Sequence, residues 1–82
     1  MFDVNELLLR AEKEAGYLNE GEIFLVKDLF KGYEWNRILI KDRLLLGTLF
    51  LNFVNKTGGS IVVFKKTSSR QQKYKKTIKS DA

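Results

Sequence analysis

The sequence contains no cysteine, no histidine and no proline among its 82 residues. Without cysteine there are no disulfides and no thiolate nucleophiles or metal ligands, and without histidine the usual zinc ligand and proton shuttle is missing. The 10 acidic residues are spread along the chain rather than paired in an apolar cluster, which disfavours two-carboxylate or metal-assisted catalysis. We therefore expect a protein that is not an enzyme, with no catalytic residues, no metal and no cofactor.

Long hydrophobic runs are also missing. The longest, such as Leu44 to Leu46, are far too short to span a bilayer, and the acidic N-terminal segment lacks the basic start of a signal peptide. A chain of 82 residues with 44% apolar composition can bury one core. We expect a cytoplasmic protein with no membrane partner, one domain over residues 1–78 and a frayed tail over residues 79–82.

Charge is distributed unevenly along the chain. Residues 1–55 carry seven Lys and Arg against nine Asp and Glu, whereas residues 56–82 carry eight against one. The first part therefore has a net charge of −2 and the second a net charge of +7. A basic surface on one side of a small domain attracts phosphate polymers, although solvated lysines also favour solubility.

Hydrophobic periodicity predicts the helices. Asp3 is expected to cap a helix over residues 4–15, and a brief helix over residues 27–31 precedes a turn or helix anchored by Trp35. A long helix is predicted over residues 40–56. Its expected inward stripe consists of Leu45, Leu46, Leu49, Phe50, Phe53 and Val54. Gly47 inside this helix suggests the close approach of another helix.

Three stretches are typical of strands. A short strand is predicted over residues 23–26, and a hairpin is predicted from strands over residues 60–66 and 71–78 around a turn at residues 67–70. The order helix, strand, helix, helix, strand, strand is that of the α+β winged helix-turn-helix, with a three-helix core, a short strand and a C-terminal two-stranded wing. Winged helix-turn-helix is therefore the predicted fold class.

The outward face of the third helix differs from that of most duplex readers, which carry basic or amide side chains there. With the apolar stripe inward, the outward residues are Leu44, Thr48, Leu51, Asn52 and Asn55, with Lys41 near the start. Such a face suits another protein chain or unstacked bases, so Leu44, Thr48 and Leu51 are candidate protein contacts. Alternatively, Leu44 and Leu51 pack beneath the first helix or the Trp35 loop.

The predicted hairpin is strongly basic. Its candidate phosphate partners are Lys65, Lys66, Arg70, Lys73, Lys75 and Lys76, with Gln71 and Gln72 as amides and Tyr74 as a stacking plane. Strand alternation allows Tyr74 to belong to the core instead, and the lysines to protect an edge strand from aggregation. Trp35, Asn36 and Arg37 could likewise stack on a base and bind its phosphate, although a lone Trp is more often core. Arg43 could reach phosphate or pair with Glu34 or Asp42.

The stretches "VKDLFKGYEWNRI", "DRLLLG", "LFLNFV" and "KTSSRQQKYKK" resemble a family of small bacterial proteins long carried as a domain of unknown function. The likeness covers about residues 21–76. Relatives are encoded on mobile elements, notably staphylococcal cassette chromosome elements, beside replication genes that include a helicase. The resemblance implies a winged-helix protein that binds single-stranded DNA, and it assigns no metal or catalytic residue.

The leading hypothesis is a single-stranded DNA-binding protein, largely independent of sequence, that assists replication of a mobile element. One rival is a duplex-binding winged-helix regulator, which would need base-reading side chains on the third helix. Another is an interaction module that docks an acidic partner such as a replication helicase or polymerase, and self-association is a further option. Binding of RNA is also left open.

Overall fold

The computed structural model describes residues 3–77, which form an α+β fold of three α-helices, one 3-10 helix and a three-stranded antiparallel sheet. The elements follow in the order α1 (Val4–Ala15), β1 (Ile23–Phe24), η1 (Val26–Leu29), α2 (Gly32–Arg37), α3 (Ile40–Asn55), β2 (Ile61–Lys66) and β3 (Gln72–Lys76). Ile78 and the predicted tail over residues 79–82 lie outside the described residues. No helix within residues 3–77 is long and apolar enough to cross a membrane.

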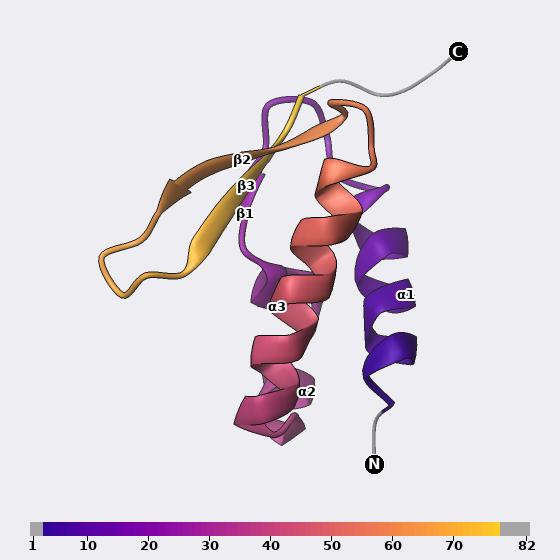
Figure 1. Ribbon diagram of the computed structural model, residues 1–82, viewed down its shortest axis with the longest axis vertical. Helices are drawn as coiled ribbons and strands as arrows, with labels where there is room; N and C mark the ends of the chain where they lie inside the picture. The colour runs from indigo at the N-terminus through magenta and orange to yellow at the C-terminus, as the bar shows by residue number, and fades with distance from the viewer. Residues whose placement is uncertain (1–2, 78–82) are drawn as a thin grey trace.

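The helix α1 has the predicted bounds because it is capped at both ends. The Asp3 carboxylate accepts a hydrogen bond from the Asn5 backbone N–H at 3.1 Å, and Gly16 ends the helix. Its small residues Ala11 and Ala15 are fully buried, so α1 can approach α3 closely. Figure 1 shows the two helices side by side.

The sheet has the strand order β1, β3, β2, which places the last strand in the centre. Phe24 of β1 and Val63 of β2 both pair with Tyr74 of β3. The rings of Phe24, Phe50 and Tyr74 meet with centroid distances between 5.1 and 6.2 Å. This aromatic cluster joins the sheet to α3 and forms the centre of the core.

The predicted elements between α1 and α2 are shorter than expected. The strand β1 ends at Phe24 because the Asp28 carboxylate accepts a hydrogen bond from the Leu25 N–H at 2.9 Å, which starts the 3-10 turn η1. The brief helix predicted over residues 27–31 is this 3-10 turn. The uncertain segment around Trp35 is a separate short helix, α2.

Two predictions about α3 are wrong. Leu45 was placed in the buried stripe but remains 46% exposed, because neighbours in a helix are about 100° apart and the core covers the side of Leu46, Phe50 and Val54. Gly47 does not mark a close helix contact, since a Cβ atom there would have no neighbour within 4 Å. Gly47 faces a surface groove instead.

Candidate nucleic-acid interface

A groove of about 460 Å³ runs between the outward face of α3 and the β2–β3 hairpin. The helix contributes Ile40, Arg43, Leu44, Gly47, Thr48 and Leu51 to its lining. The hairpin contributes Lys66, Arg70, Gln71, Gln72 and Tyr74. Leu25, Val26, Lys27 and Trp35 complete the lining from the segment before α3. The groove is partly open to solvent. Figure 1 shows that the hairpin extends away from the helices.

The side of the groove formed by α3 is apolar. Leu44 is 70% exposed and Leu51 is 36% exposed. The Thr48 hydroxyl donates its hydrogen bond to the Leu44 carbonyl within the helix, so it does not make this side polar. The prediction that these three residues face outward is therefore confirmed. The alternative, in which Leu44 and Leu51 pack beneath α1 or the Trp35 loop, is wrong for Leu44 because most of its side chain is in solvent.

Opposite this apolar surface, a β-bulge brings a lysine to the groove. The pairing of β2 with β3 shifts between Val63, which stands opposite Tyr74, and Lys66, which stands opposite Gln72. Regular alternation would have placed Lys65 opposite Gln72. Because the bulge adds one residue, Lys66 shares the face of Gln72 and Tyr74 and lines the groove.

The turn of the hairpin places Arg70 at the groove in an unusual backbone conformation. Arg70 has φ 68°, and within residues 3–77 it is the only residue other than glycine with positive φ. Thr67 holds the turn closed: its carbonyl accepts from the Arg70 N–H at 2.9 Å and its hydroxyl accepts from the Gln71 N–H at 3.0 Å. Glycine would adopt this conformation with less strain, so the arginine side chain is kept at a cost in stability.

The side chains of Trp35 and Arg43 pack against each other. The Arg43 guanidinium lies 5.4 Å from the centre of the Trp35 ring, and it donates to the Ile38 carbonyl at 3.0 Å and the Asn36 carbonyl at 3.3 Å. Trp35 also packs on Phe30, with ring centroids 5.9 Å apart. Trp35 is therefore half-buried between these neighbours and presents a limited surface to the groove. Arg43 pairs with neither Glu34 nor Asp42, two partners considered from the sequence.

Three other predicted contacts lie near the groove but do not line it. Asn36 and Arg37 are exposed on α2, and the Arg37 guanidinium stacks over the Tyr33 ring at 5.0 Å. Lys41 is exposed in the first turn of α3. None of the three is among the residues that line the groove.

Two predicted contacts are wrong because their side chains are buried. Tyr74 is 2% exposed and packs between Phe24 and Phe50, so no base can stack on its face, and burial raises the pKa of its hydroxyl above 10.0. Lys76 is 7% exposed, and its Nζ atom donates to the Ala15 carbonyl at 2.9 Å. The alternative interpretation of Tyr74 as a core residue is confirmed.

The remaining lysines of the hairpin face the other side of the sheet. Lys75 stands opposite Val62 and Ile23, and Lys73 shares its face by strand alternation. Lys65 lies within the bulge. None of these three lysines lines the groove, so the basic side chains of the hairpin are divided between two faces of the sheet.

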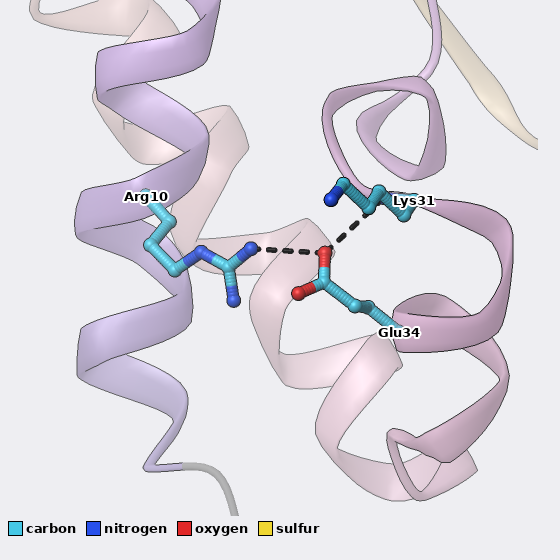
Figure 2. Close-up of polar contacts among 3 residues, drawn as sticks. All are labelled: Arg10, Lys31 and Glu34. Atoms are coloured by element: carbon cyan, nitrogen blue, oxygen red, sulfur yellow. Dashed lines mark hydrogen bonds and ion pairs between the residues drawn. The ribbon is translucent and has the colours of Figure 1, made fainter.

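The cations of the hairpin are not neutralised by carboxylates. Within residues 3–77 the one ion pair joins Arg10 of α1 to Glu34 of α2 at 3.0 Å (Figure 2), away from the hairpin. Partial burial opposes ionisation of Glu34, but hydrogen bonds from the Arg10 guanidinium and the Lys31 backbone N–H outweigh it and lower the pKa of the carboxyl. Apart from the buried Lys76, the basic side chains of the hairpin thus remain available to an external anion.

Sequence reasoning missed some residues of the groove. Lys27 and Ile40 line it, although they lie in segments to which no binding role was assigned. Lys27 belongs to a 3-10 turn 39 positions before Lys66, and no local pattern indicates that the two lysines share a groove. The sequence did offer a signal for Ile40, because it lies one helical turn before Leu44, which was predicted to face outward. In the structure Ile40 is 68% exposed.

Comparison with known proteins places the chain in a family. Residues 10–76 match the model of the domain of unknown function DUF1413, and the chain belongs to this family. No curated protein matches the sequence, and no solved structure matches the fold. The family description assigns no activity to its members.

Proposed function

We propose that this protein is a winged-helix protein that binds single-stranded DNA, largely without regard to sequence, and has no enzymatic role. The order of its elements supports the fold assignment. In a winged helix-turn-helix, α3 would be the helix that faces the ligand and the β2–β3 hairpin would be the wing. The groove between them is then the ligand-binding surface of the fold.

The observation that carries the proposal is the composition of this groove. One side offers the apolar surface of Leu44 and Leu51, and the other offers the cations Lys66 and Arg70. The 3-10 turn η1 adds a third cation, Lys27. A single strand presents unpaired bases and phosphates side by side, and it is bound by apolar or aromatic surfaces beside a positively charged track. A double helix buries its bases and presents phosphates on both edges of its grooves.

The surface of α3 also argues against duplex recognition. Helices that read the major groove present Arg, Lys, Asn or Gln to base edges. Three of the six α3 residues in the groove are aliphatic, and none is Lys, Asn or Gln. The one arginine among them, Arg43, is already engaged by two carbonyls and Trp35. Single-stranded DNA is therefore the better match for this groove.

The proposed setting is the replication system of a bacterial mobile element. This part of the proposal rests on the resemblance of the sequence to small proteins encoded beside a replication helicase. In that setting the protein would hold the strand that the helicase exposes. A helicase or polymerase of the same element is the corresponding candidate protein partner.

One observation favours a second function, the binding of another protein. Leu44 and Ile40 are 70% and 68% exposed, which is unusual for neighbouring aliphatic residues on one helix. An apolar segment of a partner, or a second copy of this chain, could cover them. A partner bound there would cover the apolar side of the groove, which would leave the hairpin as the DNA contact.

Competition between a labelled single strand and its annealed duplex tests the proposal. Fluorescence anisotropy at fixed salt should show tighter binding of the single strand. Three groove cations, at about 0.7 per phosphate contact, predict a slope near −2 for log affinity against log salt from the groove alone. Preference for the duplex would support the regulator instead, and no binding at low salt would leave the protein-binding function.

A further inference from the structure

The face of the sheet that points away from the helices has its own aromatic and basic side chains. Phe64 and Lys65 form the bulge of β2 and stand opposite Lys73, which alternates with the buried Tyr74 and so points to the other side. Lys75 is on the same face as Lys73. None of the four residues lines the groove.

Phe64 is the exposed aromatic residue of this face. It is 40% exposed, whereas Tyr74 is 2% exposed and Trp35 is half-buried against Arg43 and Phe30. The two aromatic residues expected to stack on bases are thus occupied within the domain. Phe64 exposes part of its ring beside the lysines of the hairpin, and within residues 3–77 it has no aromatic or cation–π partner.

The charges around Phe64 match a polyanion. Lys73 and Lys75 are half-buried, which is consistent with aliphatic stems that lie along the sheet while the ammonium groups reach solvent. No Asp or Glu occurs between Lys56 and Ser80. Glu22, next to β1, directs its carboxylate to the Asn19 N–H at 2.6 Å and forms no ion pair within residues 3–77.

We infer that this outer face, formed by Phe64, Lys65, Lys73 and Lys75, is a second contact surface for the single strand, on which Phe64 stacks with a base. The inference rests on the proposed function and adds to it a residue that binds bases. The strand β2 is an edge of the sheet, and its bulge lies between the groove and the outer face. One strand can therefore pass from the groove around this edge, contacting Lys66 on one face and Lys65 on the other.

The two surfaces together predict a steeper salt dependence than the groove alone. Lys65, Lys73 and Lys75 add three phosphate contacts, so at about 0.7 per contact the slope should approach −4 instead of −2. Replacing these three lysines by glutamine should return the slope to about −2 while the groove still binds. The slope therefore reports the outer face separately from the groove.

Anisotropy titrations of the full chain with labelled oligothymidine test the role of Phe64. Phe64→Ala should weaken binding on the order of 5- to 150-fold, the range for loss of one stacked base. Phe64→Trp should keep the affinity, and in a Trp35→Phe background its fluorescence should be quenched as oligothymidine is added. Tyr17→Ala is the matched control, because Tyr17 is an aromatic residue 68% exposed beyond α1, and it should bind as the unaltered protein does.

Failure of this inference can be told apart from failure of the proposed function. If Lys66→Gln weakens binding while Phe64→Ala and the triple glutamine variant leave affinity and slope unchanged, the outer face is overturned and the groove is retained. If the unaltered protein does not bind oligothymidine at low salt, the proposed function itself is wrong. Circular dichroism of each variant verifies the fold, and Phe64→Trp covers the case in which alanine disturbs the bulge.

Discussion

The Nζ atom of Lys76 lies 2.9 Å from the carbonyl oxygen of Ala15, so the final residue of β3 binds the C-terminal end of α1. The carbonyls at the end of a helix carry a partial negative charge and lack partners within the helix. A buried ammonium group satisfies one of them here. This contact links the first and last elements of the domain.

Lys76→Met should destabilise the protein by about 1.5–3 kcal/mol, the usual contribution of a hydrogen bond to a charged group. Lys75→Met is the matched control, because Lys75 is its neighbour on the opposite face of the sheet. Urea denaturation should show a lower midpoint for Lys76→Met alone, and anisotropy should show weaker single-strand binding for Lys75→Met. Equal midpoints for the two variants would mean that the contact with Ala15 contributes nothing.

Arg70→Gly should separate stability from binding. Glycine relieves the positive φ of 68°, so the free energy of unfolding should rise by about 1 kcal/mol. Loss of the guanidinium should weaken single-strand binding and reduce the salt slope by about 0.7. Thermal denaturation and anisotropy measure the two effects. A variant that is more stable and binds equally well would show that Arg70 makes no phosphate contact.

Gly47 allows the width of the groove to be altered from α3. Gly47→Ala should stabilise the helix by up to about 1 kcal/mol, since alanine is the better helix former and its Cβ meets no atom within 4 Å. Gly47→Leu should fill part of the groove and weaken binding. Titration of both variants with oligothymidine tests this, and unchanged affinity for Gly47→Leu would place the bases elsewhere.

The Arg10–Glu34 ion pair should make stability depend on acid. The pKa of Glu34 is lower in the folded state than the ordinary value of 4.5, so the contribution of its ionised form is present above that value. It is lost as the pH falls through the lower pKa of the folded state. Urea midpoints of Glu34→Gln and the unaltered protein should therefore differ at neutral pH and converge at acid pH. A constant difference between the two proteins at both pH values would contradict this assignment.

Periodicity was sufficient to predict the main elements. The bounds of α1 match the prediction, and α3 ends one residue before the predicted position, since both helices have apolar residues at regular spacing. The hairpin was also predicted, because a run of β-branched and aromatic residues in β2 is separated from the polar strand β3 by the turn residues 67–70. These features depend on neighbouring residues, which one sequence is enough to show.

The site was less predictable because it depends on contacts between distant segments. Alternation left the role of Tyr74 open, and only its packing on Phe24 and Phe50 decides it. The burial of Lys76 depends on a carbonyl 61 positions earlier in the chain. Alternation already separates Lys73 and Lys75 from Lys76, but the bulge cannot be seen in the sequence of β2, so the placement of Lys66 rather than Lys65 on the groove face was missed.

The number of residues in the bulge between Val63 and Lys66 can change without altering the core of the domain. Removing one residue there would restore regular alternation without moving Ile61 or Tyr74, and Lys66 would keep its partner Gln72. The outer surface alone would then lose a side chain. The length of this segment, more than the number of lysines in it, would thus set how far a bound strand extends around the hairpin.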